Sequence, residues 1–427
     1  MKFDKNMEHF KKTENFIPLC SQTFSKSHTQ FSFGYSPIFA ERAEGCYLWD
    51  VDGNQFIDYV GGLGAISIGY NNPEINKAII EQLHKGITFT LPHKLETKLA
   101  EMLSEIFPCA DMTRFGKNGS DATTGAIRVA RAYTGRNTIA ICGYHGWHDW
   151  YICTTSRNEG IPPVIGEMSE VFNYNDITSL EKIFAKHPGD VAAVILEPIG
   201  VEFPKDKFLE KVRDLCDKNG ALLIFDEIVT GFRLALGGGQ EYFKVVPDLA
   251  TTGKGMANGM PISALMGKRK IMKKLEDVFF SFTFGGEALS IAASIATIHF
   301  IKEHRVIREI HENGKELWNG MNHLFDKHDF RKTMELVGYP PRQAFHFFTS
   351  SNYTPEELKT LIQELCHERN LIFLGVHNLS YSHTKKVIKD TLEIYDEVFR
   401  LLSAIIKKNQ VREKIRGRVI QSVFRKL

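Results

Sequence analysis

Three short apolar runs, separated by segments with helical periodicity, limit the folds open to this chain more than any other feature. The runs are NTIAIC (137–142), VAAVILEP (191–198) and GALLIFDE (220–227). Before and between them, segments such as PEINKAIIEQLHKG and LETKLAEMLSEIF repeat apolar residues at the spacing of an amphipathic helix. Uninterrupted apolar runs suit strands that are covered on both faces. We therefore expect an α/β lobe with a largely parallel sheet from about residue 76 to 309.

Both ends of the chain are expected to build a second, smaller α+β lobe. The segment CYLWDVDGNQFIDYV (46–60) indicates two short strands around Asp52 and Gly53, a dipeptide that favours a tight hairpin. After about residue 310 come two strand candidates and a long amphipathic helix: ELVGYPPRQAFHFF, NLIFLGVHNLSYSH and TKKVIKDTLEIYDEVFRLLSAII. The expected division is 1–75 and 310–427 for the small lobe and 76–309 for the large one.

The C-terminal segment KKNQVREKIRGRVIQSVFRKL is strongly basic. Against the single acid Glu413 it carries Lys407, Lys408, Arg412, Lys414, Arg416, Arg418, Arg425 and Lys426. Such a charge run is compatible with a solvated helix or with a docking surface, and we expect the solvated helix.

Composition and charge favour a protein that handles small molecules and contacts other protein chains. The 53 basic and 51 acidic residues leave a formal charge of +2, so no global field attracts nucleic acid or an anionic membrane. The start, MKFDKNMEHFKK, lacks the apolar run of a secretory signal, and no later stretch is long enough to span a bilayer, so we expect a cytoplasmic protein. Seven cysteines without a CxxC pair suit a reducing compartment and indicate neither a disulfide framework nor a metal site.

Two acids and one lysine are the first candidates for chemistry. Asp226 and Glu227 directly follow an apolar run, which places them at the carboxyl end of a buried strand, where ligands bind in open parallel sheets. For an isolated pair of acids, capping of the next turn is the alternative. Lys254 lies between two glycines in PDLATTGKGMANGMP (247–261), directly before the strand-like ISALMG. The lysine and the aspartate are therefore expected near the same sheet edge.

A third element, FGKNGSDATTGAIRVARAYTGR (115–136), runs from a Gly-Ser-Asp turn into a helix with apolar Ile127, Val129 and Ala130. Backbone N–H groups at such a turn, together with the helix dipole, form a cradle for phosphate. N-capping by Ser120 or Asp121 explains the same residues. Together the three elements indicate a site for pyridoxal phosphate (PLP), because this cofactor requires a desolvated lysine, a carboxylate and a phosphate cradle.

Longer motifs give the same indication. Four motifs carry a resemblance to a known family: FDEIVTGFR, then PDLATTGKGMANGMP, with YHG at 144–146 and TFGGEALSIAA at 283–293. The chain resembles the class III, fold-type I PLP-dependent aminotransferases, and among them most closely the glutamate-1-semialdehyde aminomutases. The resemblance extends from SPIFAERAEGCYLWDVDG to SHTKKVIKDTLEIYDEVF, most of the chain. It implies a large α/β lobe with a mainly parallel sheet, a smaller α+β lobe built from both chain ends, and PLP as cofactor.

The resemblance also implies a role for individual residues. Lys254 would carry the cofactor covalently and move protons, and Asp226 would face the pyridine nitrogen. Tyr144 would stack on one face of the ring, with Ile228 on the other. The full set of implied cofactor-binding residues is Gly119, Ser120, Tyr144, His145, Glu197, Glu202, Asp226, Ile228, Lys254 and Thr283.

The phosphate site carries an implication for assembly. Gly119 and Ser120 would hold the phosphate with help from Thr283 of a neighbouring subunit, which implies a homodimer with a shared active site. For Thr283, capping of a helix that begins near Ala288 is the alternative.

Departures from the aminomutase pattern fall at positions implied to recognise the substrate. Lys26 stands roughly where the aminomutases have an arginine for the substrate carboxylate, and Glu202 replaces an asparagine near the cofactor's phenolic oxygen. The segment FLGVHNLSYSH is shorter than its counterpart and lacks a glutamate. His377 and Asn378 could line the substrate mouth there, although a surface turn is the expectation for either residue alone.

The expected activity is therefore amino transfer to a carbonyl compound other than a simple α-keto acid, with a sugar or nucleotide-linked intermediate of surface-glycan synthesis as the candidate. Two alternatives stay open. The first is a glutamate-1-semialdehyde aminomutase, an isomerase. The second is a scaffold that keeps the fold without catalysis, although a buried lysine and a buried aspartate are costly to keep without a ligand.

Overall fold

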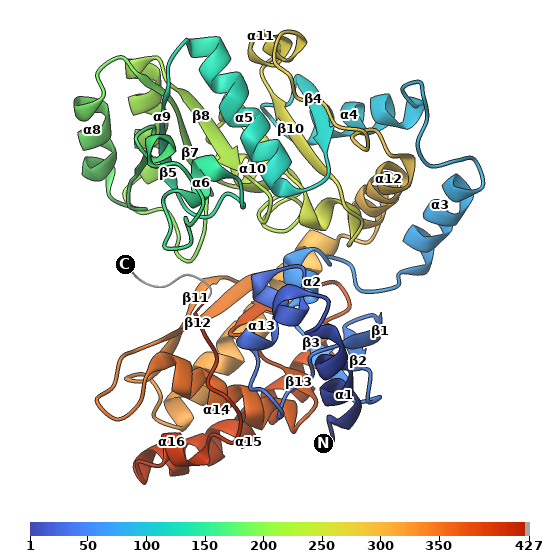
Figure 1. Ribbon diagram of the computed structural model, residues 1–427, viewed down its shortest axis with the longest axis vertical. Coiled ribbons are helices and arrows are strands. Elements are labelled where there is room, and N and C mark those ends of the chain that lie inside the picture. Colours follow the sequence, from blue (N-terminus) through green and yellow to red (C-terminus); the bar gives the residue numbers. More distant parts are fainter. Residues whose placement is uncertain (423–427) are drawn as a thin grey trace. The chain divides into compact units, whose positions relative to one another are not determined.

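The computed structural model describes residues 1–422, which form two compact units (Figure 1). Unit 1 combines Met1–Asn72 with residues 308–422, and unit 2 is Pro73–Ile307. Helix α13 (Val306–Lys327) crosses this division after its first two residues. Within the described residues, no helix is both long and apolar enough to cross a membrane.

A seven-stranded sheet forms the centre of unit 2, in the order β4-β10-β9-β8-β7-β5-β6 (Figure 1). Its strands are β4 (Met112–Gly116), β5 (Thr138–Cys142), β6 (Ser169–Val171), β7 (Val191–Leu196), β8 (Leu222–Asp226), β9 (Leu249–Thr252) and β10 (Ser263–Gly267). Strand β10 runs antiparallel to both of its neighbours, and the other pairs are parallel. The predicted α/β unit with a largely parallel sheet is confirmed.

Helices and short turns connect these strands. They are α3 (Pro73–Leu83), α4 (Lys94–Ile106), α5 (Gly119–Thr134), α6 (Asp149–Ile152), α7 (Pro163–Gly166), α8 (Ile177–Lys186), α9 (Phe208–Asn219), α10 (Gly238–Phe243), η4 (Lys254–Ala257), α11 (Arg269–Met272), η5 (Lys273–Glu276) and α12 (Ala288–Glu303).

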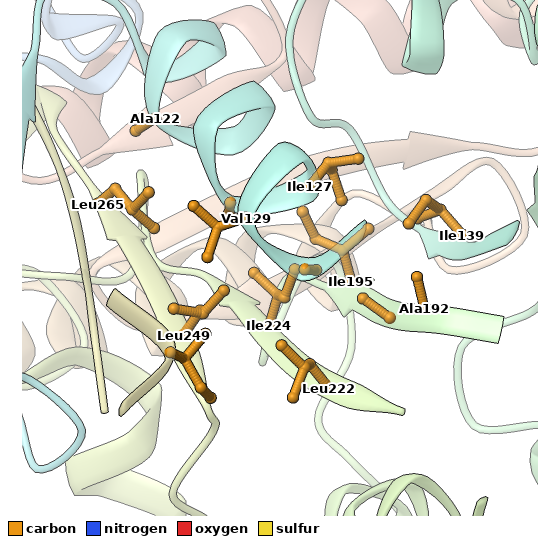
Figure 2. Close-up of a cluster of buried hydrophobic side chains, with 14 of the residues drawn as sticks. Ala122, Ile127, Val129, Ile139, Ala192, Ile195, Leu222, Ile224, Leu249 and Leu265 are labelled. Carbon is orange, nitrogen blue, oxygen red and sulfur yellow. The ribbon is translucent and has the colours of Figure 1, made fainter. Parts of the chain in front are cut away.

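Helix α5 is fixed to the sheet by a buried apolar cluster (Figure 2). The side chains labelled there are Ala122, Ile127, Val129, Ile139, Ala192, Ile195, Leu222, Ile224, Leu249 and Leu265. Ile127 and Val129 are 2% and 0% exposed, as their helical spacing predicts. Truncating such a side chain to alanine typically costs about 2–5 kcal/mol, so the first turn of α5 is held firmly at the carboxyl edge of the sheet.

Unit 1 contains two small sheets. One has the order β1-β2-β3-β13 and the other β11-β12-β14. The strands are β1 (Ala40–Glu44), β2 (Tyr47–Asp50), β3 (Gln55–Asp58), β11 (Met334–Tyr339), β12 (Arg342–Phe347), β13 (Leu371–Ile372) and β14 (Val376–Asn378). The principal helices are α1 (Asp4–Thr13), the short α2 (Gly61–Gly64), α13, α14 (Pro355–His367) and α15 (Lys385–Lys407). The hairpin, the later strands and the long helix predicted for this part of the chain are confirmed.

Local chemistry accounts for the hairpin between β2 and β3. The N–H of Gly53 donates to the carbonyl of Asp50 at 2.9 Å, and Gly53 adopts φ 87°, which favours glycine. Strand β13 pairs in parallel with β3, so a segment near residue 371 completes a sheet that begins near residue 40. This pairing ties the two chain ends into one unit.

The basic C-terminal segment differs from its prediction. Among the described residues beyond α15, only α16 (Val411–Lys414) is helical, and residues 415–422 form no regular element apart from a bridge between Arg418 and Phe33. We call residues 415–422 the C-terminal strap; Arg425 and Lys426 lie outside the described residues. Arginines around the strap pair with acids of α14: Arg412 with Glu357, and Arg416 with Glu364 and Glu368. The expected solvated helix is wrong for the strap, because the carboxylate of Glu364 accepts the backbone N–H groups of Arg416 and Gly417.

Candidate cofactor site

Asp226 is the last residue of β8, and its buried carboxylate is held by three donors. The N–H of Ile228 lies 3.1 Å from Oδ1, and Oγ1 of Thr251 lies 3.4 Å from the same oxygen. Nδ1 of His145 lies 2.8 Å from Oδ2. The side chain is therefore fixed at the carboxyl edge of the sheet, where open α/β sheets bind ligands.

The hydrogen-bond partners of His145 determine where its ring carries hydrogens. Its Nε2 lies 3.0 Å from the carbonyl oxygen of Cys142, which can only accept, so Nε2 carries a hydrogen. Nδ1 consequently shares a hydrogen with Oδ2 of Asp226 at the other side of the ring. Because the imidazole is only 2% exposed, water cannot replace either partner.

The neighbouring acid, Glu227, has a structural role. It is fully buried and accepts the N–H groups of Gly239 at 2.6 Å and Gln240 at 3.0 Å, together with the hydroxyl of Thr230. Burial raises the pKa of this carboxyl, and these donors partly offset the shift. Glu227 thus binds N–H groups in the first turn of α10, as the turn-capping alternative proposed, which leaves Asp226 as the candidate for chemistry.

Lys254 begins η4, two residues beyond the end of β9. In the register of β8 with β9, Asp226 stands opposite Thr251, so the lysine follows the same sheet edge. Lys254 adopts φ 39°, a left-handed conformation that costs about 1–3 kcal/mol for residues other than glycine. Backbone strain of this kind concentrates at functional sites, and at the partly buried Lys254 it was not predictable from the sequence.

Ile228 joins the lysine turn to the first turn of α5. A Cβ on Gly119 would lie 3.2 Å from the Ile228 side chain, and a Cβ on Gly253 would lie 3.3 Å from it. Ile228 itself is 9% exposed. The three elements expected from the sequence, Asp226, Lys254 and the turn at Gly119, are therefore brought together around one apolar side chain.

The first turn of α5 is also tied to the YHG loop. Oγ of Ser120 accepts the N–H of Trp147 at 3.2 Å, and a Cβ on Gly146 would overlap that oxygen. Asn118 is the N-cap residue of α5, and Asp121 completes the capping box, since its carboxylate accepts the N–H of Asn118 at 2.7 Å. The predicted N-capping by Ser120 or Asp121 is therefore wrong in its position, and Ser120 bonds to the neighbouring loop instead. A 16-residue helix that begins with glycine and serine presents N–H groups and a positive dipole end suited to phosphate.

Tyr144 and Glu197 lie beside this arrangement. The N–H of Tyr144 donates to Oε1 of Glu197 at 3.3 Å, and the ring of Tyr144 meets that of Tyr151 edge-on with centroids 5.4 Å apart. The Tyr144 side chain is half-exposed, so it offers an aromatic face. Burial raises the pKa of its phenol, and the negative charge of Asp226 raises it further.

Two other predicted residues have different surroundings. Glu202 lies in the loop after β7, where Nζ of Lys205 binds its carboxylate at 2.7 Å and lowers its pKa. Thr283 lies in an exposed loop, and the helix that follows it is capped by Glu287, whose Oε1 accepts the N–H of Leu289 at 2.5 Å. The capping alternative for Thr283 is therefore wrong.

The residues expected to recognise substrate lie in unit 1. Lys26 is exposed and lines a cavity of about 420 Å³ together with Arg42, Asp58 and Tyr70. His377 is 1% exposed in β14, with Nε2 bonded to the hydroxyl of Tyr395 at 2.7 Å. The expected surface turn at His377 and Asn378 is wrong, because both side chains are buried in the interior of unit 1.

Thr251 and Thr123 contribute to the site and were missed from the sequence. Thr251 reaches Asp226 only because β9 is the neighbour of β8, and strand order is not visible in the sequence. Oγ1 of Thr123 donates to the carbonyl of His145 at 2.9 Å and so links α5 to the YHG loop. Its signal was weak, because a threonine in the first turns of a helix is common.

The residues present fit PLP. A carboxylate held by three donors suits a protonated pyridine nitrogen, an apolar side chain lies between the lysine turn and the helix, and the N-terminus of α5 suits a phosphate. All of these groups belong to unit 2.

Comparison with known proteins agrees with this chemistry. Residues 31–339 match the family model described as Aminotransferase class-III. A 3-aminobutyryl-CoA aminotransferase of Cloacimonas acidaminovorans is 37% identical over 93% of this chain and 97% of its own length. A glutamate-1-semialdehyde 2,1-aminomutase of Lachnoclostridium phytofermentans is 36% identical over 87% of this chain and 93% of its own.

Solved structures show the same fold. The PLP-containing FumI protein of Sphingopyxis sp. MTA144 superposes with a TM-score of 0.87 and 30% identity, over 95% of this chain and 98% of that one. A glutamate-1-semialdehyde aminomutase of Pseudomonas aeruginosa superposes with a TM-score of 0.82 and 20% identity, over 94% of each chain. The resemblance seen in the sequence is confirmed: the chain belongs to the class III, fold-type I aminotransferases, which use PLP.

Proposed function

We propose that this enzyme transfers an amino group from an amino donor to a carbonyl acceptor that is not a simple α-keto acid, with a sugar or nucleotide-linked carbonyl as the candidate acceptor. The observation that carries amino transfer is the carboxylate of Asp226, fixed by His145, Thr251 and the backbone at the same sheet edge as Lys254. Burying a carboxylate and straining the backbone of a lysine both cost folding free energy. A bound cofactor that pairs with both groups would account for them.

The roles of the residues follow from their chemistry. Bound PLP supplies a pyridine ring that accepts electrons from a bond at the substrate carbon. Asp226 would keep the ring nitrogen protonated, and His145 would hold that carboxylate in place. Ile228 would cover the ring with an apolar surface, which excludes water. Lys254 would hold the cofactor through Nζ and move a proton to or from the substrate carbon.

Phosphate binding would fall to the first turn of α5. Gly119 and Ser120 present backbone N–H groups there, and Gly146 permits the close approach of the YHG loop. Glu197 would support the loop that carries Tyr144. Glu202 is paired with Lys205, so its influence on the cofactor's phenolic oxygen would require that ion pair to open.

The acceptor class rests on two observations. By the resemblance, Lys26 stands roughly where the aminomutases have an arginine for the substrate carboxylate, and a compact ammonium is a weaker match for a carboxylate than a guanidinium fork. A relative that covers 93% of this chain is named for 3-aminobutyryl-CoA, a substrate whose amino group is not α to a free carboxylate. The first favours an acceptor outside the simple α-keto acids, and the second favours an amine substrate other than an α-amino acid.

A panel of acceptors tests the proposal. The enzyme would be loaded with an amino donor and offered pyruvate, a nucleotide-linked keto sugar, a 3-oxoacyl thioester and glutamate-1-semialdehyde, with kcat/KM measured for each and Lys254→Ala as the inactive control. We expect the keto sugar to exceed pyruvate by roughly tenfold or more, which corresponds to about 1.4 kcal/mol in the barrier. A higher kcat/KM for pyruvate would contradict the proposal.

An aminomutase is the second candidate, favoured by the relatives of that name at 36% and 35% identity. It would convert glutamate-1-semialdehyde to 5-aminolevulinate without an added amino donor. Robust conversion under those conditions would replace amino transfer as the main activity. The scaffold alternative predicts that no donor changes the absorbance of the bound cofactor.

We also propose a homodimer in which Thr283 reaches the neighbouring subunit's phosphate site. Thr283 lies in an exposed loop between Phe282 and Phe284, which are 37% and 57% exposed, and Phe279 is 78% exposed. Three exposed aromatic side chains in one loop are typical of a surface that contacts another protein chain.

A further inference from the structure

Unit 1 contains a cavity of about 350 Å³ that includes none of the residues of the candidate cofactor site. Its walls come from α14, β12, the segment around Gly375 and the C-terminal strap. Phe345 and Phe347 of β12 supply aromatic surface, and Ile420 supplies aliphatic surface. The cavity is thus mainly apolar at the sheet and is bordered by one cation, Lys359.

The ammonium of Lys359 has no partner among residues 1–422, since no hydrogen bond or ion pair within them involves its Nζ. The side chain lies against Gly375, where a Cβ would stand 3.1 Å from Cε and 3.4 Å from Nζ. Burial lowers the pKa of Lys359 to about 8, and the negative charge of Glu356 only partly offsets this. A nearby anion would relieve this cost.

The strap that closes the cavity is anchored on both sides. The N–H of Ile420 donates to Oγ1 of Thr360 in α14 at 3.1 Å, and the N–H of Gln421 donates to the carbonyl of Thr29 at 2.9 Å. Nε2 of Gln30 returns a bond to the carbonyl of Gln421 at 2.8 Å. This wall is therefore a built part of unit 1, fixed relative to Lys359 on the same helix as Thr360.

We propose that this cavity binds a small monocarboxylic acid, with the carboxylate paired to Lys359 and the apolar body against Phe345 and Phe347. A single ammonium matches a single negative charge. Glu356, which also lines the cavity, would repel the second charge of a phosphate or a dicarboxylate. The aromatic walls favour a ligand with an apolar body over acetate or formate.

Benzoate is the probe, and benzamide is its neutral match in size and shape. Binding to the PLP-loaded enzyme would be measured by calorimetric titration for wild type, Lys359→Met and Lys389→Met. Lys389 lies on α15 of the same unit with its side chain 76% exposed, so it controls for the loss of one surface charge. We expect benzoate to bind wild type and Lys389→Met alike, and Lys359→Met roughly 10- to 100-fold more weakly.

The remaining outcomes would overturn the proposal. They are equal affinity for benzoate and benzamide, equal benzoate affinity in wild type and Lys359→Met, and no benzoate binding at millimolar concentration.

Acylation supplies a second readout that needs no variant. With a limiting amine-acylating reagent near pH 8, Lys359 should be modified ahead of the exposed lysines because of its lowered pKa, and benzoate but not benzamide should protect it. Unprotected labelling of Lys359 would place the ligand elsewhere.

Discussion

Nδ1 of His145 lies 2.8 Å from Oδ2 of Asp226, while Nε2 of the same ring lies 3.0 Å from the carbonyl oxygen of Cys142. The carbonyl fixes a hydrogen on Nε2, so the hydrogen between Nδ1 and Oδ2 is the only one that the pair can redistribute. Within unit 2, His145 is therefore a positioning residue for the carboxylate that faces the cofactor in our proposal.

Replacing His145 by leucine should weaken PLP binding and lower kcat/KM. The variant removes a hydrogen bond between the imidazole and a buried carboxylate, and hydrogen bonds to charged groups are worth about 1.5–3 kcal/mol, which corresponds to roughly 10- to 100-fold in affinity. His145→Gln, which keeps an amide N–H donor, should recover part of the loss. PLP titration of the apoenzyme checks both variants.

A structural role for His145 alone would give a different pattern. In that case His145→Leu would lower the thermal midpoint, and His145→Gln would not recover PLP affinity at equal stability. His187→Leu serves as the matched control, because His187 pairs with Glu170 elsewhere in unit 2. Loss of PLP affinity in that control would show that the effect is general.

Lys254→Ala should abolish covalent attachment of the cofactor while unit 2 stays folded. The residues that would hold the phosphate and the ring nitrogen, including Ser120 and Asp226, remain in the variant, so free PLP should still bind. Borohydride reduction followed by peptide mass spectrometry locates the attachment in the wild-type enzyme. A reduced adduct on any other lysine would show that Lys254 is not the attachment site.

Thr283→Val should weaken PLP binding roughly 10- to 100-fold if its hydroxyl reaches the neighbouring subunit's phosphate. Thr283→Ser, which keeps the hydroxyl, should bind PLP as the wild type does. PLP affinity of the wild type should also fall as the protein is diluted, because dissociation leaves each site incomplete. Sedimentation across the same dilution series measures the dimer, and a monomer with full PLP affinity would refute the shared site.

The sequence was sufficient for the elements whose signals are local. The apolar run that ends at Asp226 predicted a buried strand, and the glycine-flanked Lys254 next to a further strand candidate predicted that both residues share one sheet edge. The different roles of Asp226 and Glu227 were not predictable. They depend on which of the two side chains meets the N–H groups of Gly239 and Gln240, a long-range contact.

Two segments were misinterpreted because their structure also depends on contacts between residues that are distant in the sequence. The basic C-terminal segment looked like a solvated helix because a charge run is normally exposed, but Arg412 of α16 and Arg416 of the strap meet acids of α14 about 50 residues away in sequence. His377 looked like a turn residue because it is polar and lies near Gly375 and Asn378. It is buried against Tyr395, 18 residues along the chain, and no local sequence pattern predicts the hydrogen bond between these two side chains.

The last prediction concerns the acid stability of unit 1, where His367 is buried as a neutral ring. Its Nε2 accepts the N–H of Phe373 at 3.4 Å, so Nδ1 donates to Oγ of Ser36 at 2.8 Å. Burial lowers its pKa from the ordinary 6.5 to about 3. Below about pH 6.5 the unfolded chain binds a proton that the folded chain refuses, so the free energy of unfolding should fall as pH drops toward 3 and stay flat above 7.

His367→Gln removes this titration and should flatten the acid side of the stability curve by up to about 1.4 kcal/mol per pH unit. Urea unfolding at several values between about pH 7 and pH 4 measures the slope. His346→Gln is the control, because His346 lies in the same unit with its side chain 55% exposed. Its side chain meets solvent in the folded and in the unfolded chain, so its variant should keep the wild-type slope. An unchanged slope in His367→Gln would show that the ring accepts a proton in the folded protein.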